Sequence, residues 1–165
     1  MTIVGVISDT HGLLRSEALE ALAGSDLIIH AGDIGDVAVL DGLRALAPVV
    51  AVRGNNDRDR WALDIPCVAA VDVGGARFHV LHILGELDLD PQASGFHVVV
   101  SGHSHQPKIE TRDGVLYLNP GSAGPRRFRL PVSLARVEVS NAVIRPQIIE
   151  LSVASSTRRL MGQRR

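Results

Sequence analysis

The sequence has one cysteine, few aromatic residues and almost no excess charge. Cys67 is the single cysteine among 165 residues, which excludes an intrachain disulfide and a zinc site built on cysteine pairs, and agrees with a reducing compartment. Aromatic residues make up 3% of the chain and the formal net charge is −1. Platforms for stacking bases are therefore few, and no general basic field attracts nucleic acid or anionic lipid. We expect no nucleic acid partner.

Long hydrophobic runs are also missing. Glycine, aspartate or histidine interrupts the apolar stretches well before the roughly 18 residues that a membrane helix needs, so we expect no membrane partner. The start, MTIVGVISDTHG, has no positively charged segment and no small-residue cleavage site, and it is typical of a first strand rather than of a signal peptide. These absences predict a cytoplasmic protein, and they leave open whether it forms a homo-oligomer.

The residues that are present suffice for one folded domain. Hydrophobic residues make up 45% and charged residues 21%, as in ordinary globular proteins, and no shift in composition marks a second domain. We assign a single domain to residues 1–153. Residues 154–165 form a basic tail with four arginines, which we expect to be solvated and poorly ordered because little in it can pack.

The first third of the chain alternates strand-like and helix-like segments, which predicts a parallel sheet with crossover helices at 15–24 and 36–47. From Pro66 onward the apolar runs are strand-like, with hairpin signals at Asp113–Gly114 and Asn141–Ala142. An α/β domain with two sheets packed face to face and helices outside would bury both sets of strands.

Polar side chains stand where successive apolar runs end. Ligands bind beyond the carboxyl ends of strands in open parallel sheets, so these groups can converge on one crevice although they lie far apart in the sequence. Glycines beside them allow sharp turns and close approach of the backbone. The set comprises Asp9, His11, Asp33, Asn55, His82, His103 and His105.

This set has the chemistry of a metal site. His103 and His105 are two residues apart after the run FHVVV, so both imidazoles can point one way; by itself, SGHSH also fits a polar turn with two solvated histidines. Two carboxylates, one amide and four imidazoles suit Mn²⁺, Fe²⁺, Zn²⁺ or Ni²⁺. Seven ligands exceed the needs of one tetrahedral ion, whereas two ions about 3.5–4 Å apart would use them all and could clamp both oxygens of a phosphoryl displacement.

Five motifs occur in a fixed order, namely D-x-H (Asp9, His11), G-D (Asp33), G-N (Asn55), a single histidine (His82) and G-H-x-H (His103, His105). This order resembles that of the calcineurin-like metallophosphoesterases over about residues 3–122. The ending LYLNPGS and the small size are similar to the small bacterial and archaeal, YfcE-like phosphodiesterases. The resemblance implies a four-layer αββα sandwich of two mixed β-sheets flanked by helices.

The resemblance also implies a division of the ligands between two divalent metal ions. We expect Mn²⁺, with Ni²⁺, Zn²⁺ and Fe²⁺ as alternatives, and the hypothesis that follows is in-line attack on phosphorus by a hydroxide that bridges the ions. One ion would be held by Asp9, His11 and His105, the other by Asn55, His82 and His103, and Asp33 would bridge them.

Two positions depart from the family pattern. Asn56 stands where many relatives have a histidine that can contact phosphate or protonate the leaving group, and an amide can donate a hydrogen bond but is no general acid near neutral pH. We assign Asn56 a weak catalytic and substrate-binding role and expect substrates with acidic leaving groups. Leu84 stands where relatives often have another histidine.

Other charged residues receive simpler interpretations. We expect His30 to support a metal ligand from behind, or to be a satisfied core histidine, rather than to bind metal. Arg126 and Arg127 are expected to be solvated, with contact to substrate phosphate as the alternative. Asp57 and Asp59 look like parts of a charged loop with no assigned role.

Together these features predict a metal-dependent phosphodiesterase that hydrolyses small phosphodiesters. A phosphomonoesterase and a nuclease are alternatives at the same centre. A non-catalytic protein-binding scaffold on the same fold is a further alternative, because a fold does not fix a function.

Overall fold

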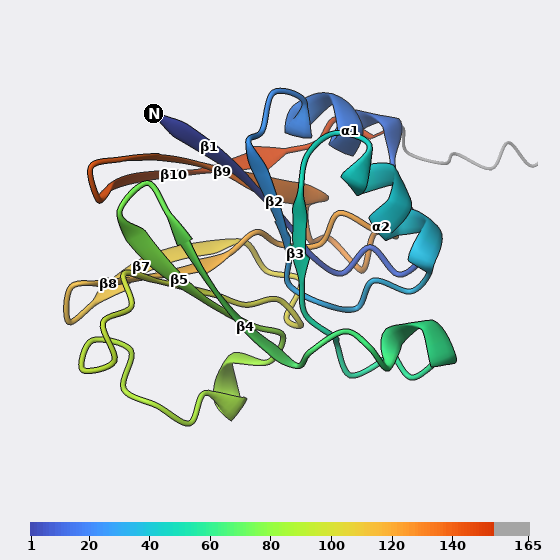
Figure 1. Ribbon diagram of the computed structural model, residues 1–165. Coiled ribbons are helices and arrows are strands. Elements are labelled where there is room, and N and C mark those ends of the chain that lie inside the picture. The colour runs from blue at the N-terminus through green and yellow to red at the C-terminus, as the bar shows by residue number, and fades with distance from the viewer. Residues whose placement is uncertain (154–165) are drawn as a thin grey trace, which may run out of the picture.

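The computed structural model describes residues 1–153, which form two five-stranded sheets packed face to face (Figure 1). The basic tail expected at 154–165 lies outside the described residues. None of the described helices is long and apolar enough to cross a membrane.

The first sheet has the strand order β10-β9-β1-β2-β3. Its parallel part is the predicted β-α-β-α-β unit, in which α1 (Ser16–Leu22) and α2 (Val37–Arg44) connect neighbouring strands, and an antiparallel hairpin extends it. The strands are β1 (Thr2–Ile7), β2 (Leu27–His30), β3 (Val49–Ala51), β9 (Ser133–Ser140) and β10 (Val143–Glu150).

The second sheet has the order β4-β5-β6-β8-β7. Its three central strands are parallel, and an antiparallel strand closes each edge. The predicted turns at Asp113–Gly114 and Asn141–Ala142 connect β7 to β8 and β9 to β10, with positive φ at all four residues, as tight hairpin turns require. The strands are β4 (Val68–Val73), β5 (Ala76–Leu81), β6 (Val98–Val100), β7 (Lys108–Arg112) and β8 (Val115–Asn119).

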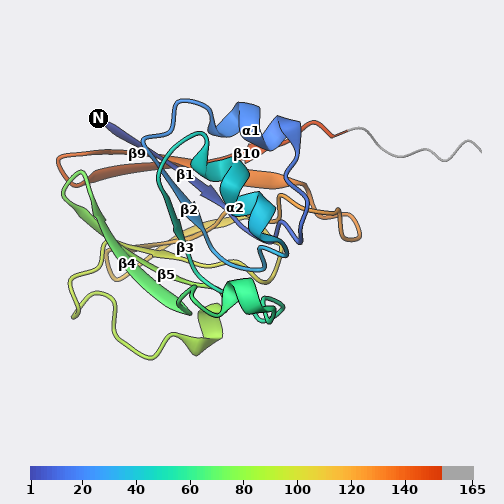
Figure 2. The same cartoon turned by 45° about the vertical axis from the view of Figure 1, so that its right-hand side comes forward.

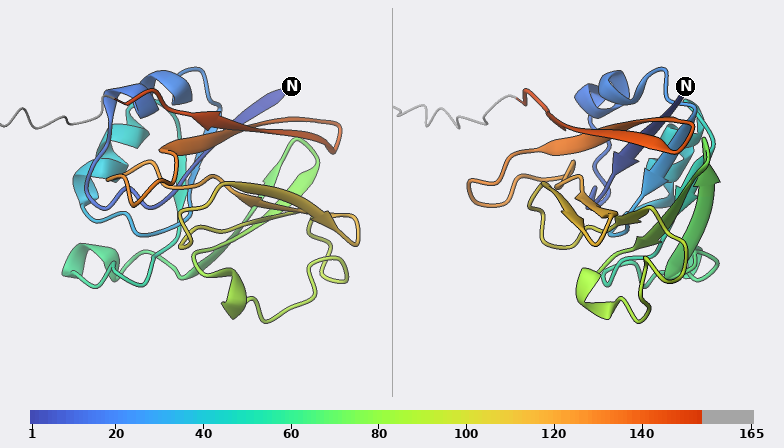
Figure 3. Two further views of the ribbon diagram at one scale, coloured as in Figure 1. Left: turned by 180° about the vertical axis from the view of Figure 1, so that it is seen from behind. Right: turned by 90° about the vertical axis from the view of Figure 1, so that its left-hand side faces the viewer.

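Alternating side chains divide the core into layers. On β2, Ile29 packs between the two sheets, whereas Ile28 packs beneath the helices, because successive residues of a strand face opposite sides. Figures 2 and 3 show both α1 and α2 on the outer face of the first sheet. The strands therefore carry the helices on one face and the opposing sheet on the other.

The outer face of the second sheet is covered by the segment 83–97, whose helical part is the short 3₁₀ helix η2 (Leu84–Glu86). Leu84 and Leu87 of this segment pack with Tyr117 against buried Val99. A second 3₁₀ helix, η1 (Arg60–Ala62), follows β3. The expected sandwich is thus confirmed, with an irregular fourth layer in place of regular helices.

Candidate metal centre

The seven side chains singled out in the sequence meet at one edge of the sandwich, beyond the carboxyl ends of five parallel strands. Each strand of the two parallel sets ends in a loop that enters this edge, so side chains from both sheets face one another there. Asp9 and His11 follow β1, Asp33 follows β2, Asn55 follows β3, His82 follows β5, and His103 and His105 follow β6.

The backbone of these loops is unusually constrained. Five of the seven residues have φ between 47° and 69°, a left-handed conformation that side chains other than glycine adopt rarely and at a cost. Such strain persists only where the surrounding structure imposes it, and it concentrates at functional sites. The five residues are Asp9, His11, Asp33, His103 and His105.

Two glycines allow the loops to approach one another closely. A Cβ atom on Gly54 would overlap the backbone nitrogen and the carboxylate of Asp33, and one on Gly102 would overlap the hydroxyl of Ser8 and crowd Asp9. The absence of a side chain at these two positions therefore permits the contact between loops that gathers the ligands.

The first group consists of Asp9, His11 and His105. His105 Nε2 lies 3.3 Å from Asp9 Oδ1 and 3.4 Å from His11 Nε2. The other carboxylate oxygen of Asp9 accepts hydrogen bonds from the Ser8 hydroxyl at 2.6 Å and from the backbone nitrogen of His103 at 3.1 Å. These bonds orient the carboxylate so that Oδ1 faces the two imidazoles.

The second group consists of Asp33, His82 and His103, with Asn55 beside it. His82 Nδ1 donates to the carbonyl of Ala31 at 2.7 Å, which directs Nε2 toward Asp33 Oδ2 at 3.4 Å. His103 Nδ1 lies 3.0 Å from Asn55 Oδ1. The bond from His82 to a backbone carbonyl is of the kind that commonly orients a histidine that binds metal.

Asp33 lies between the two groups. Its Oδ2 is 3.4 Å from His82 Nε2 and 3.7 Å from His11 Nε2, so it faces one histidine of each group. Its other oxygen, Oδ1, accepts a hydrogen bond from the backbone nitrogen of Asn56 at 3.0 Å. This is the position that a bridging carboxylate would need.

The two central titratable groups are biased toward opposite charges. Burial acts to raise the pKa of Asp33, but the adjacent imidazole of His82 and the hydrogen bond from Asn56 N outweigh it and hold that pKa well below its usual range. Burial acts to lower the pKa of His82, yet the Asp33 carboxylate, the Ala31 carbonyl and Asp9 raise it. The site therefore keeps a carboxylate ionised in a buried position, as a cation site requires.

The residues present fit a pair of divalent cations. Asp9 Oδ1 and His82 Nε2 are buried and have no hydrogen-bond partner among the described residues, which is costly unless something absent from the protein satisfies them. In each group of three, the potential ligand atoms lie within 4.8 Å of one another. Oxygen and imidazole donors of this kind suit borderline divalent ions.

His30 lies behind the centre, as expected, and is fully buried. Its Nδ1 accepts from the backbone nitrogen of Gly32 at 3.1 Å, so its Nε2–H donates to the Thr10 hydroxyl at 3.0 Å, which in turn donates to the Ile34 carbonyl at 2.8 Å. Burial, aided by the nearby charge of His82, lowers the pKa of His30 to about 3. This neutral imidazole ties the loop after β1 to the loop after β2.

Asp57 has a structural role that the sequence analysis missed. Its buried carboxylate accepts hydrogen bonds from the backbone nitrogens of Ile34, Gly35 and Gly54 at 2.9–3.0 Å, and so joins the loops after β2 and β3. Asp57 is only two residues from Asn55 and is flanked by other acidic and basic residues, so the local pattern is that of a solvated loop.

In the structure, Asn56 forms hydrogen bonds with Asp33. Its backbone nitrogen and its side-chain Nδ2 both donate to the Asp33 carboxylate at 3.0 Å. Asn56 therefore positions the central carboxylate, and its expected contact with substrate remains a prediction.

A cavity of about 270 Å³ adjoins the centre at His103. Its walls combine apolar side chains with polar and charged ones, and Leu84, the departure noted in the sequence, contributes to the apolar part. Asn119 holds the adjacent loop by donating to the Gly102 carbonyl and the Ser104 hydroxyl at 3.0 and 3.1 Å. The cavity lies between η2 and the strands β7 and β8.

Comparison with known proteins agrees with this geometry. The family model of the calcineurin-like phosphoesterase superfamily domain matches residues 1–142. A probable metallophosphoesterase of Methanocaldococcus jannaschii is 37% identical over 135 residues, which cover 73% of this chain and 67% of that protein.

Solved structures share the fold at low sequence identity. A novel archaeal phosphodiesterase is 24% identical with a TM-score of 0.75, over 90% of this chain and 100% of that one. Vps29 of Chaetomium thermophilum is 19% identical with a TM-score of 0.73, over 92% and 97%. The chain thus belongs to the calcineurin-like phosphoesterase superfamily, in which it resembles the small YfcE-like enzymes.

Proposed function

We propose that this chain is a binuclear metal-dependent phosphodiesterase that acts on small phosphodiesters. The observation that carries the proposal is the pair of adjoining three-residue groups, in which Asp33 of one faces His11 of the other, with buried ligand atoms that have no partner among the described residues. The expected ion is Mn²⁺, and the single cysteine supports a reducing compartment such as the cytoplasm.

The seven ligands would be divided between the two ions. Asp9, His11 and His105 would hold one ion, Asn55, His82 and His103 the other, and Asp33 would contact both. When bound, such ions lower the pKa of coordinated water and stabilise charge on phosphoryl oxygens. Hydrolysis then needs no serine or cysteine nucleophile: the oxygen of water bonds to phosphorus, one ester bond breaks, and the released alcohol takes the proton.

Two observations favour substrates with an acidic organic leaving group, such as aryl phosphodiesters. Asn56 is no general acid, and its side-chain donor is engaged by Asp33, so a leaving group must depart without a proton from this position. The partly apolar cavity beside His103 offers space for the organic part of such a leaving group. An acidic alcohol with an aromatic or apolar body meets both conditions.

The direct test is hydrolysis of bis(p-nitrophenyl) phosphate and p-nitrophenyl phosphate by protein stripped with EDTA and reloaded with Mn²⁺, Ni²⁺, Zn²⁺ or Mg²⁺. We expect the diester to be preferred and His103→Ala to lower kcat/KM at least about a hundredfold, because it removes a ligand. His97→Ala, which removes an exposed histidine outside the centre, is the matched control and should remain active.

Unchanged diester hydrolysis in the His103→Ala variant would refute the proposed site. A preference for the monoester would favour the phosphomonoesterase alternative. A chain that binds a protein partner but hydrolyses neither substrate under any metal would be a scaffold, which the intact ligand set argues against.

A further inference from the structure

The loop between β8 and β9 forms a projection beside the metal centre, which we call the arginine arm and define as residues 125–130 (Figure 2). Its base is fixed to the loop that carries the first ligands. The Ser122 hydroxyl donates to the Asp9 carbonyl at 3.0 Å, and a Cβ atom on Gly124 would overlap the carbonyls of Asp9 and Thr10. The arm therefore begins directly behind a metal ligand.

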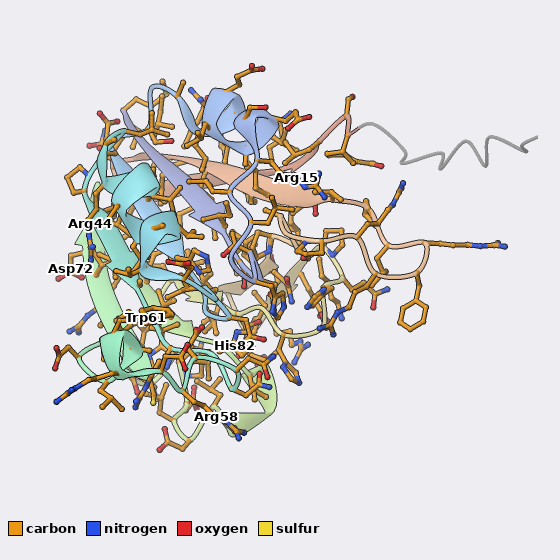
Figure 4. The ribbon with its side chains drawn as sticks, turned by 90° about the vertical axis from the view of Figure 1, so that its right-hand side faces the viewer. Arg15, Arg44, Arg58, Trp61, Asp72 and His82 are labelled. Atoms are coloured by element: carbon orange, nitrogen blue, oxygen red, sulfur yellow. The ribbon has the colours of Figure 1, made fainter. Side chains whose placement is uncertain are left out.

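In Figure 4, Arg15 lies on the side of the molecule that faces the viewer, as does His82. Arg15, which directly precedes α1, donates from Nη2 to the Gly124 carbonyl at 3.2 Å and so holds the base of the arm. At the other end, Leu130 N donates to the Arg127 carbonyl at 3.1 Å, and Arg126 Nε donates to the Leu130 carbonyl at 3.3 Å. These bonds close the arm on itself and give it a defined shape.

The tip carries an aromatic ring that does not pack on the protein. Phe128 is 94% exposed and has φ 52°, a conformation that is strained for a bulky residue. Strained backbone of this kind concentrates at sites that contact ligands, and the exposed ring contributes nothing to the core, so we expect its role to be in binding.

The positive charge of the arm is not neutralised by ion pairs within the described part of the chain. Arg126, Arg127 and Arg129 form no ion pair with any carboxylate of residues 1–153. Because the Ser122 hydroxyl fixes the base of the arm to the Asp9 carbonyl, the segment that carries these charges begins beside the centre.

From this juxtaposition, an exposed aromatic ring among three unpaired guanidinium groups at the rim of the metal centre, we infer that the arm binds a single-stranded oligonucleotide. Phe128 would stack on a base and the arginines would contact the flanking phosphates, which is how aromatic and basic residues together bind single strands. The inference rests on the proposed function, because it places one phosphodiester of the strand near the centre. It also reverses the expectation, drawn from composition, that nucleic acid is no partner.

Fluorescence anisotropy of a short fluorescein-labelled oligo(dT) in excess EDTA tests binding without hydrolysis. We expect the wild-type chain to bind, and Phe128→Ala to raise Kd about five- to a hundredfold, since stacking on an aromatic residue contributes that much per base. Phe128→Trp should retain binding. Arg127→Gln should raise Kd and reduce the slope of log K against log salt by about 0.7.

The matched control is Arg44→Gln, which removes one positive charge from the exposed end of α2, far from His82 in Figure 4, and should leave Kd unchanged. Equal effects of Arg44→Gln and Arg127→Gln, or binding unaffected by Phe128→Ala, would overturn the inference. Binding to anionic lipid vesicles without binding to oligo(dT) would overturn it as well. Failure of the proposed function appears separately, as a lack of bis(p-nitrophenyl) phosphate hydrolysis by the metal-loaded wild-type chain.

Discussion

Individual residues in this protein do their work through the backbone as much as through their side chains. The ligands after β1, β2 and β6 adopt left-handed conformations, and the carboxylate of Asp57 and the imidazole of His30 fix the loops in that state. Neither Asp57 nor His30 forms a hydrogen bond with the loops of the second sheet, which carry the other ligands. Each can therefore be tested without removing a ligand.

His30 makes the stability of the fold depend on pH in a defined direction. Its pKa is lowered from 6.5 to about 3 by burial, so the unfolded chain binds a proton more readily than the folded one. The stabilising effect of the neutral ring is therefore complete above about pH 6.5 and is lost progressively as the pH falls toward 3.

We expect the free energy of unfolding of the wild-type chain in EDTA, measured with urea, to fall between pH 7 and pH 5. His30→Asn, which has no proton to take up, should lose less stability over the same range, and the two slopes should differ by at most about 1.4 kcal/mol per pH unit. Parallel pH dependences in the two proteins would show that His30 is not a buried neutral group.

Asp57 supports the centre without lining it. Asp57→Asn replaces an ionised acceptor of three backbone hydrogen bonds by an amide with one acceptor oxygen, so we expect a loss of about 1–3 kcal/mol in the free energy of unfolding. Asp59→Asn, in the same loop but exposed, is the control and should change stability by less than about 0.5 kcal/mol. Similar losses of free energy of unfolding in the two variants would contradict the role of Asp57 in joining the loops.

At the scale of elements, the alternation of strands and helices and the hairpin turns could be predicted because each leaves a local pattern. The turn at Asp113–Gly114 pairs the residues that favour positive φ, and the two helices have apolar residues at helical spacing. The cover of the second sheet could not be predicted in this way, because the segment 83–97 is held by Leu84 and Leu87 packing on Tyr117, a contact between distant residues.

The same limit applies to the centre. The order of its motifs identifies the seven ligands, but the supporting role of Asp57 depends on backbone nitrogens of another loop. Arg126 and Arg127 look like ordinary surface arginines in the sequence. Only the fold fixes the loop that carries them to the Asp9 carbonyl, through the Ser122 hydroxyl.

The packing of α1 on β1 depends on one glycine. A Cβ atom on Gly5 would lie 2.5 Å from Leu22 Cδ2 and 2.9 Å from Ser25 Oγ, so Gly5→Ala must displace the helix or force the leucine from its rotamer. We expect a loss of about 1–3 kcal/mol in the free energy of unfolding, measured with urea. Gly85→Ala, where a Cβ atom meets nothing within 4 Å, should be tolerated, and an equal tolerance at Gly5 would contradict the close packing.

At the scale of the whole molecule, the two sheets act together to build one rim. The first sheet contributes Asp9, His11, Asp33 and Asn55, and the second contributes His82, His103 and His105. Since Asp33 of the first sheet faces His82 of the second at 3.4 Å, cations bound there would join the two halves of the sandwich. Metal binding and folding are then coupled, because a ligand that binds the folded state alone stabilises it.

The stoichiometry of metal binding tests the central claim most directly. Protein stripped with EDTA is titrated with Mn²⁺ by isothermal titration calorimetry, and the bound metal is counted after gel filtration by elemental analysis. The account predicts two ions per chain in the wild type and at most one in Asp33→Asn, which loses the shared carboxylate. A wild-type chain that binds one ion or none, or a variant that still binds two ions with equal affinity, would contradict it.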